Sequence, residues 1–172
     1  METSHFNRGD GAGMVYRVRI GWGDIDFARN IFWARYFPYV EHAIGEWLTA
    51  KGFDWRKLVD EKNLGMPAVR LDVRFVRPVR LQEMVRIQLA VRGLTRRGCR
   101  FAFYIYREGD GELCASGYVS RRFIDAAKFR GIELPDDMYG CLLEMQEESR
   151  GVGLGTVGAA AAHGRPGDGS GS

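Results

Sequence analysis

Apolar and polar residues alternate in five separate stretches of the chain. Alternation with a period of two is typical of strands that have one buried face and one solvated face. The five stretches span residues 16–22, 69–75, 85–91, 101–106 and 113–124. Because the last four follow one another with short connections, the pattern predicts a run of antiparallel strands.

The segment between the first and second stretches has the helical period of 3.6 residues instead. Its apolar stripe consists of Phe37, Val40, Ile44, Trp47 and Leu48. This spacing predicts an amphipathic helix at 35–51, with Pro38 in the first turn, where proline is tolerated. Gly52 suits a left-handed cap at its end. The pattern is also compatible with a short turn of helix at 55–62 and a last helix at 135–148.

The predicted order of elements is one strand, one long helix and four further strands. This order indicates an α+β domain in which a five-stranded antiparallel sheet packs its apolar face against the helix. One helix and one sheet leave strand edges without partners, and unpaired edges promote association. We therefore expect a homodimer or a homotetramer.

Length and composition agree with a single domain between two polar tails. The chain has 172 residues, of which 45% are hydrophobic and 27% are charged, as in ordinary soluble globular proteins. Residues 1–13 and 151–172 lack apolar side chains that would offset ordering entropy, so we expect disordered tails around a domain at 14–150. The sequence shows neither a secretory signal nor the roughly 20 apolar residues of a membrane-spanning helix. A cytoplasmic location is therefore expected.

Cysteine and histidine are too few and too scattered for a disulfide framework or a zinc site. The cysteines are Cys99, Cys114 and Cys141, an odd number at wide spacing, and the chain has three histidines. We expect the cysteines to pack as small apolar residues. No metal and no cofactor is expected.

Basic residues are concentrated in one half of the chain, although the formal net charge is only +3. Residues 67–130 contain thirteen arginines and one lysine against six acids. Such a half is suited to an anion, either a phosphorylated small molecule or a nucleic acid. Arginines also decorate the wet face of an ordinary sheet, so the charge by itself leaves these interpretations open.

The loop before the helix combines two acids with many aromatic residues. Asp24 and Asp26 stand near the predicted helix start, and seven of the chain's 21 aromatic residues fall between Trp22 and Tyr39. In one interpretation, Asp26 or Asn30 merely caps the helix or a turn. In the other, a carboxylate is a nucleophile or general base, and N–H groups of the helix start polarise a carbonyl. The aromatic residues favour the second, because they suit an apolar pocket or an interface.

The segment from Gly23 to Ala43 reads GDIDFARNIFWARYFPYVEHA. It contains Gly-Asp-x-Asp, then a tyrosine ten residues after the second aspartate (Tyr36) and a glutamate five residues later (Glu41). This spacing resembles the active-site signature of hot-dog-fold acyl-CoA thioesterases of the 4-hydroxybenzoyl-CoA thioesterase type. The likeness extends over about residues 15–125 and implies the hot-dog fold, a five-stranded antiparallel sheet wrapped around one long helix.

The resemblance also implies roles for individual residues. Asp26 matches the catalytic carboxylate, which attacks the thioester carbonyl or activates water, whereas Asp24 is expected to be structural. Trp33 matches the position whose backbone N–H polarises that carbonyl. The substrate-binding residues that the resemblance implies are Phe32, Tyr36, Arg96, Arg97 and Arg121, with the arginines at positions where relatives hold CoA phosphates.

Some positions depart from the family pattern. Arg29 and Asn30 stand where many relatives have Gly and then His or Gly, and Trp33 replaces a histidine that some relatives carry. Histidine-assisted chemistry at that position is therefore excluded, and the identity of the acyl group stays open. Arg29 has the length to pair with Asp24 or to reach an acyl group.

The sequence favours a thioesterase that hydrolyses an acyl- or aroyl-CoA to the free acid and CoA. Because a thiolate leaves readily, a lone carboxylate is sufficient for this reaction. Two alternatives are a hot-dog hydratase or dehydratase, which usually pairs a histidine with an acid, and a non-catalytic module that binds acyl-CoA or an acyl carrier. Nucleic acid and membranes are not expected as partners, because RNA-binding sheets carry no acidic, aromatic loop of this kind.

Overall fold

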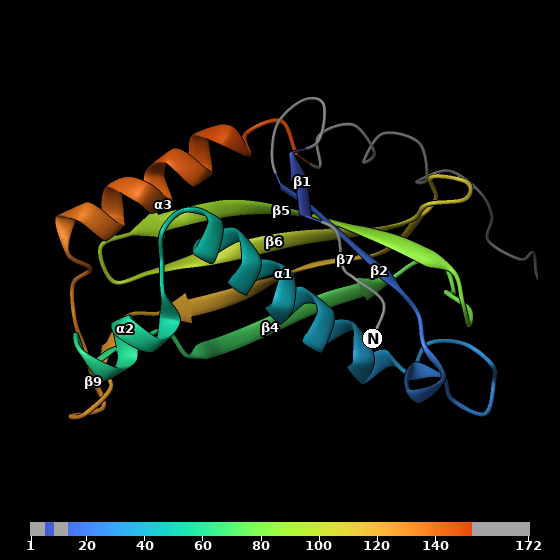
Figure 1. The fold of residues 1–172 in the computed structure, drawn as a ribbon, viewed down its shortest axis with the longest axis horizontal. Helices are drawn as coiled ribbons and strands as arrows, with labels where there is room; N and C mark the ends of the chain where they lie inside the picture. Colours follow the sequence, from blue (N-terminus) through green and yellow to red (C-terminus); the bar gives the residue numbers. More distant parts are fainter. Residues whose placement is uncertain (1–5, 9–13, 153–172) are drawn as a thin grey trace, which may run out of the picture.

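The long helix lies across one face of an antiparallel sheet (Figure 1). The structure, a computed structural model, describes residues 6–8 and 14–152. Within these residues the sheet has six strands, in the order β1 (Phe6–Arg8), β2 (Met14–Arg19), β5 (Met84–Thr95), β6 (Gly98–Arg107), β7 (Leu113–Arg122) and β4 (Ala68–Phe75). The predicted α+β architecture is confirmed, and β4 forms one edge of the sheet.

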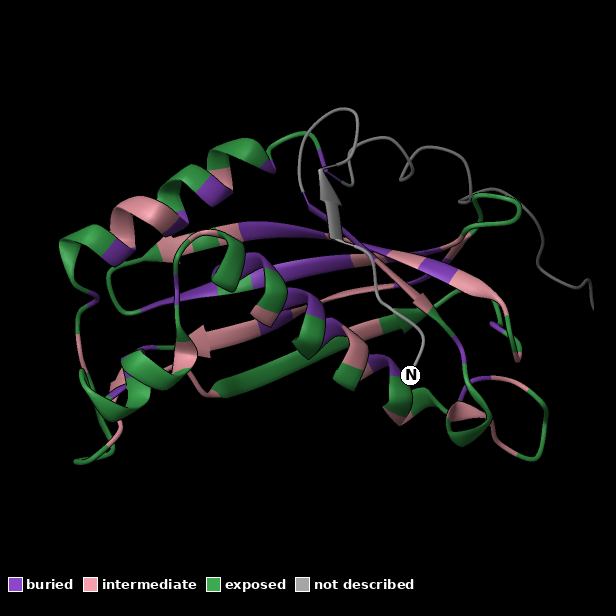
Figure 2. Ribbon diagram, in the orientation of Figure 1, coloured by how far each residue is buried: buried purple, intermediate pink, exposed green. Residues whose placement is uncertain are grey.

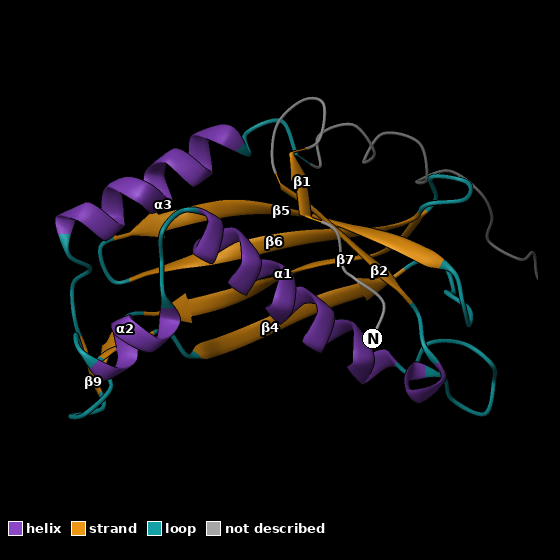
Figure 3. Ribbon diagram, in the orientation of Figure 1, coloured by secondary structure: helices purple, strands orange, loops and turns teal. Residues whose placement is uncertain are grey.

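The remaining elements flank this sheet (Figure 3). They are the helices α1 (Tyr36–Ala50), α2 (Trp55–Asp60) and α3 (Asp136–Glu148), the 3-10 turns Trp22–Asp24 and Trp33–Arg35, and a smaller sheet of β3 (Leu64–Gly65), β8 (Ile124–Asp125) and β9 (Arg130–Gly131). As predicted, α1 ends in a left-handed glycine, since Gly52 has φ +89°. None of the described helices is long and apolar enough to cross a membrane.

The structure differs from the expected domain boundaries at both ends of the chain. Phe6–Arg8, within the N-terminal segment expected to be disordered, pairs as β1 with β2. The reason is that β2 would otherwise present an open edge of unpaired N–H and C=O groups. A neighbouring backbone can pair with such an edge regardless of its own side chains. At the other end Val152 is buried, two residues past the expected boundary. The rest of the two expected tails lies outside the described residues.

The first strand is also placed differently from its prediction. It runs over Met14–Arg19, whereas the alternation suggested 16–22. The chain leaves the sheet because Trp22–Asp24 forms a 3-10 turn, in which the Gly21 N–H donates to Asp24 Oδ2 at 2.9 Å. The turn starts the loop that leads to α1.

The core lies between α1 and the inner face of the sheet, where Figure 2 shows buried residues on both. Tyr36, rather than the predicted Phe37, is fully buried at the start of the helix, because its ring packs 5.3 Å from that of Phe75. The other buried residues of α1 are Val40, Ala43, Ile44, Trp47 and Leu48, and those of the central strands include Ile87, Leu89, Val91, Phe101, Phe103 and Ile105. The apolar residues that recur with the helical period and those that alternate along the strands thus pack together in one core.

The last helix covers the part of β5 that β2 leaves open. β2 pairs with β5 only as far as Gln88. Beyond it, the Val91 N–H donates to Ser149 Oγ at 3.1 Å, and the Arg92 guanidinium donates to the carbonyl oxygens of Ser149 and Val152, both at 3.0 Å. The end of α3 therefore satisfies strand groups that have no neighbouring strand.

β7 leaves no room for a side chain at Gly117, where it pairs with β4, and this generates a stability prediction. A Cβ at Gly117 would lie 2.0 Å from the Asp72 carbonyl oxygen and 2.8 Å from Cζ of Phe103. Gly117→Ala must displace the edge strand, so we expect it to lower the free energy of unfolding by about 2 kcal/mol or more. Urea denaturation measures the change. Gly109→Ala is the matched control, because its Cβ would meet no atom within 4 Å; similar losses in the two variants would contradict the packing argument.

Candidate active site

The acidic, aromatic loop folds into a small hairpin in front of α1. Ile25 and Ile31 form an isolated antiparallel bridge, and the Asp26 N–H donates to the Asn30 carbonyl oxygen at 2.9 Å. The loop is tied to the connection before β5, because the Ile31 N–H donates to the carbonyl oxygen of buried Val79 at 2.8 Å. These backbone bonds fix Asp26 close to the start of the helix.

The Asp26 carboxylate is half-buried and uses one of its oxygens to hold the turn. Oδ1 accepts the Ala28 N–H at 2.8 Å and, more weakly, the Asn30 N–H at 3.4 Å. Among the described residues the other oxygen, Oδ2, accepts no hydrogen bond. The capping interpretation and the chemical interpretation of Asp26 are therefore compatible, because each uses a different oxygen.

Asp24 ties the loop to the helix. Its Oδ2 accepts hydrogen bonds from the Gly21 N–H and from the hydroxyl of Tyr39 on α1. Burial, and then the hydrogen bond to Asp24, raises the pKa of Tyr39 well above its ordinary value of about 10. Asp24 thus has a structural position, and its partner is Tyr39 rather than Arg29.

The start of the helix presents a backbone donor and two exposed rings. Trp33 is the first residue of the 3-10 turn that continues into α1, so its N–H has no partner within that turn. The Phe32 N–H is different, because it donates to the Asp24 carbonyl oxygen at 2.7 Å. The side chains of Phe32 and Trp33 are exposed, with ring centroids 5.4 Å apart. A polarised N–H and apolar surface therefore occur together.

A cavity of about 250 Å³ opens beside this helix start. Trp33 and Tyr36, which the sequence singled out, both line it, whereas Asp26 and Phe32 do not. Burial raises the pKa of Tyr36 well above its ordinary value, so its hydroxyl stays protonated at physiological pH. Its lining residues are Ile31, Trp33, Tyr36, Phe75, Val76, Arg77 and Pro78. The cavity is mostly apolar and suits a small acyl or aroyl group.

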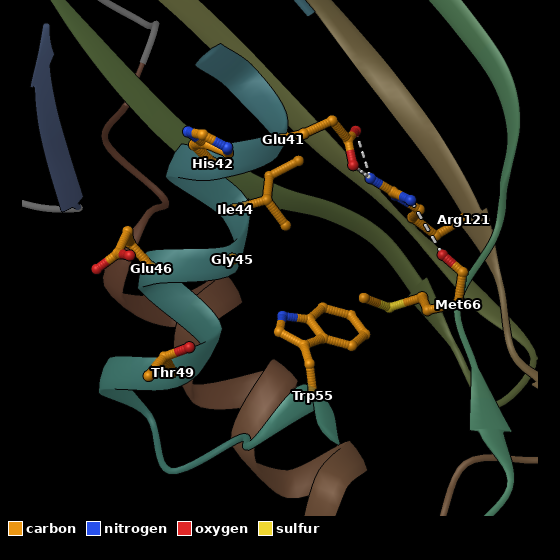
Figure 4. Close-up of a pocket in the computed structure, with 9 residues that line it drawn as sticks. All are labelled: Glu41, His42, Ile44, Gly45, Glu46, Thr49, Trp55, Met66 and Arg121. Atoms are coloured by element: carbon orange, nitrogen blue, oxygen red, sulfur yellow. Dashed lines mark hydrogen bonds and ion pairs between the residues drawn. The ribbon is translucent and has the colours of Figure 1, made fainter. Parts of the chain in front are cut away.

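A larger cavity of about 530 Å³ lies farther along α1 (Figure 4). Figure 4 shows Arg121 reaching from β7 towards Glu41 of the helix. The Arg121 guanidinium pairs with both Glu41 oxygens and donates to the Met66 carbonyl oxygen at 3.0 Å. Its side chain is only 10% exposed, and its Nε is buried without a partner among the described residues. Within one protomer, therefore, the charge of Arg121 is already neutralised.

Arg96 and Arg97 lie at the opposite end of the sheet from the helix start (Figure 1). They occupy the turn between β5 and β6, and β5 alone is 12 residues long, or roughly 35 Å. Arg96 pairs with Asp136 and stacks on the Tyr139 ring at 4.3 Å, and Arg97 pairs with Glu133 at 3.4 Å. The structure does not bring these two arginines to Asp26 within one protomer.

The cysteines occupy packing positions, as the sequence suggested. Cys99 and Cys114 are buried and Cys141 is half-buried. Burial raises the pKa of the Cys99 thiol to about 12, which keeps it protonated and unreactive at neutral pH. In the described part of the chain, no three His, Cys, Asp or Glu side chains gather closely enough to hold a metal ion.

Comparison with known proteins places the chain in a family. Residues 20–142 match the Thioesterase-like superfamily. The chain belongs to this superfamily. The match covers the acidic loop, α1 and the whole of the strand run, so the family recognised from the loop signature is confirmed.

Individual relatives agree with this assignment. A 1,4-dihydroxy-2-naphthoyl-CoA hydrolase of Thermosynechococcus vestitus is 20% identical over 134 residues, covering 78% of this chain and 91% of the relative. The crystal structure of a 1,4-dihydroxy-2-naphthoyl-CoA thioesterase from Synechocystis superposes with a TM-score of 0.72 at 14% identity, covering 78% and 98% of the two chains. A Staphylococcus aureus protein in complex with CoA gives 0.75 at 10%, covering 83% and 90%. These similarities confirm the hot-dog fold.

The Tyr39 hydroxyl provides a test of how the loop is anchored. Tyr39→Phe removes its hydrogen bond to Asp24, so we expect a loss of about 1 kcal/mol in the free energy of unfolding at pH 7. Folding raises the pKa of Tyr39, so the stability that its neutral hydroxyl contributes is complete at pH values below the pKa of the unfolded chain, near 10. This stability is lost as the pH rises above that value. The variant should therefore lose less stability than the wild type between pH 9 and 11. Urea denaturation at several pH values measures both effects.

The control for this experiment is Tyr104→Phe, on β6, outside the loop. It should not change the alkaline loss of stability. The anchoring role of Tyr39 would be refuted if the two phenylalanine variants behaved alike at pH 7 and in the alkaline range.

Proposed function

We propose that the protein is a thioesterase that hydrolyses an acyl- or aroyl-CoA thioester to the free acid and CoA. The observation that supports this most is the combination at the helix start: a carboxylate oxygen of Asp26 that accepts no hydrogen bond from the described residues, the backbone N–H of Trp33, and an apolar cavity beside them. The names of the relatives agree with a CoA thioester as substrate.

In this proposal the thioester carbonyl oxygen accepts the Trp33 N–H. The N–H and the positive end of the helix dipole stabilise the negative charge that develops on this oxygen. Tyr36 contacts the acyl group inside the 250 Å³ cavity, and the exposed ring of Phe32 contacts it outside the cavity. The backbone of Trp33 therefore has the chemical role, and its side chain shapes the site.

Asp26 supplies the second part of the reaction through Oδ2. As a general base it takes a proton from water while the water oxygen attacks the carbonyl carbon, and the C–S bond then breaks. As a nucleophile it attacks the carbon itself and forms an anhydride, which water hydrolyses. In the first route Asp26 passes the proton that it took from water to the departing sulfur, so that CoA leaves as the thiol. In the second route the C–S bond breaks as the anhydride forms, and CoA leaves as the thiolate before water hydrolyses the anhydride; the protons released by that water neutralise the thiolate and the site. Both routes need an ionised Asp26.

The Asp26→Asn variant tests the catalytic assignment. Asparagine keeps an Oδ1 that can accept the Ala28 N–H, so the turn and the melting temperature should be preserved. Turnover should fall by at least about 100-fold, because the amide neither accepts the proton nor attacks the carbonyl. A thiol-release assay over aromatic, short, medium and long acyl-CoAs measures this and also identifies the acyl group.

Asp60→Asn, at the end of α2, is the matched control and should retain wild-type turnover. Folded Asp26→Asn protein with wild-type turnover would refute the assignment. Binding of acyl-CoA by the wild type without release of thiol would instead favour a non-catalytic acyl-CoA module.

We also infer that the functional unit is a dimer joined through β4. This strand is an edge of the sheet, is eight residues long, and is largely exposed in Figure 2. Its inward-facing residues Val69, Leu71 and Phe75 are 56%, 44% and 46% exposed, which is unusual for large apolar side chains. Antiparallel pairing with β4 of a second copy would complete its hydrogen bonds and cover these side chains.

The dimer also bears on the arginines that lie far from Asp26. A two-fold axis through paired β4 strands reverses the strand direction between the copies. The end of one sheet that carries Arg96, Arg97 and Arg121 then lies at the same end as the helix start of the other copy. A role for these arginines in binding CoA phosphates therefore depends on the second subunit.

Light scattering at micromolar concentration tests the dimer. We expect at least twice the 19.4 kDa mass of one chain. Leu71→Lys should shift the mass towards the monomer, because a charge would then be buried at the β4 contact. Leu143→Lys, on the outer side of α3, is the control, since Leu143 is 41% exposed and Leu71 is 44% exposed. An active wild-type protein with the mass of a single chain would contradict the dimer.

A further inference from the structure

Arg29 adopts a backbone conformation that arginine does not favour. Its φ is +63°, in the left-handed region, where a Cβ atom is strained and glycine is not. The turn around Asp26 requires this conformation, because the Arg29 N–H donates to the Asp26 carbonyl oxygen at 3.0 Å. Glycine would make the same turn with less strain. Strained residues that persist are frequently found at functional sites, so the side chain of Arg29 is a candidate for a role of its own.

The guanidinium of Arg29 is available for such a role. The residue is exposed, and no side chain or carbonyl oxygen of residues 6–8 or 14–152 forms an ion pair or hydrogen bond with its guanidinium. Other arginines are engaged: Arg96, Arg97 and Arg121 pair with Asp136, Glu133 and Glu41. The arginine nearest to the candidate catalytic carboxylate in sequence is thus left with unused donors.

Arg80 brings a further unused guanidinium to the same place. It forms an isolated antiparallel bridge with Asn30, so the Cα atoms of Arg29 and Arg80 lie at most about 9 Å apart. Arg80 is exposed, and its guanidinium likewise has no partner within the described part of the chain. The nearby carboxylate of Glu83 accepts the Arg80 N–H at 2.9 Å and lies 3.8 Å from the Arg107 guanidinium. Glu83 therefore does not pair with the Arg80 side chain.

We propose that Arg29 and Arg80 form a subsite for an anionic group of the thioester substrate, next to Asp26. Both chain segments are held by backbone bonds, and two planar guanidinium groups with unused donors suit a phosphate or a carboxylate. The anionic group is either a phosphate of the carrier or a carboxylate on the acyl group. This inference rests on the proposed thioesterase function. It assigns a binding site to a part of the substrate that the helix start does not contact.

The test compares Arg29→Gln and Arg80→Gln on thioesters that differ in one anionic group. The substrates are an acyl-CoA, the same acyl group on pantetheine, which has no phosphate, and a pantetheine thioester whose acyl group ends in a carboxylate. For substrates with the bound anion we expect KM to rise by about five- to thirty-fold with little change in kcat, because the contact is made in ground and transition states alike. For substrates without it KM should not change.

The pattern identifies the source of the anion. A rise for acyl-CoA alone assigns the subsite to a carrier phosphate, and a rise for the carboxylate-bearing pantetheine thioester assigns it to the acyl group. Arg130→Gln is the matched control, since Arg130 is an exposed arginine of β9. Unchanged KM values for all three substrates in both variants, or equal increases for all three, would overturn the proposal.

Arg29→Gly separates a binding role from a structural one. Glycine relieves the left-handed strain, so the melting temperature should stay equal or rise while KM for the anionic substrate increases. A fall in melting temperature together with an unchanged KM would show that Arg29 only supports the loop, and would refute the subsite. These outcomes differ from failure of the thioesterase proposal, in which wild-type protein releases no thiol from any thioester.

Discussion

The geometry of the site depends on backbone hydrogen bonds between the loop before α1 and the connection before β5. The Ile31 N–H bonds to the Val79 carbonyl oxygen, the Ile20 N–H bonds to the Glu83 carbonyl oxygen, and Asn30 forms a bridge with Arg80. Val79 is fully buried, so these bonds are protected from water. They determine where α1 begins above the sheet. The positions of the Asp26 carboxylate, the Trp33 N–H and the 250 Å³ cavity all follow from that one attachment.

The strand edges of the sheet are covered to different extents within the described residues. β1 pairs with the outer edge of β2, and the end of α3 accepts hydrogen bonds from the open part of β5. β4 receives no such cover from the described residues, although its inner face carries exposed apolar side chains. The larger cavity between α1 and Met66, at the beginning of β4, opens on the same part of the molecule. An assembly through β4 would thus place functional surfaces of two copies next to each other.

The sequence predicted those features that depend on local periodicity. The long helix, its glycine cap and the four later strands follow from side-chain patterns, and their positions differ from the prediction by only a few residues. Features that depend on contacts between distant segments could not be predicted in this way. The bridge from Asn30 to Arg80, the pairing of Arg121 with Glu41 and the closure of β5 by Ser149 join residues 50 or more positions apart. Arginine content alone likewise did not reveal which arginines have acidic partners.

The ion pairs show which arginines of residues 67–130, the basic half of the chain, already have acidic partners. Six of its thirteen arginines form ion pairs with described acids: Arg70, Arg77, Arg96, Arg97, Arg107 and Arg121. Arg80 is not among them. An exposed ion pair contributes little stability, but it removes a cation from the set that can bind a ligand. Arg80 lies beside Arg29, and both are attached to the turn that holds Asp26. Arg29 and Arg80 thus place two guanidinium groups without partners among the described residues at the loop that carries Asp26, and their positive potential would draw a negatively charged thioester towards the proposed site.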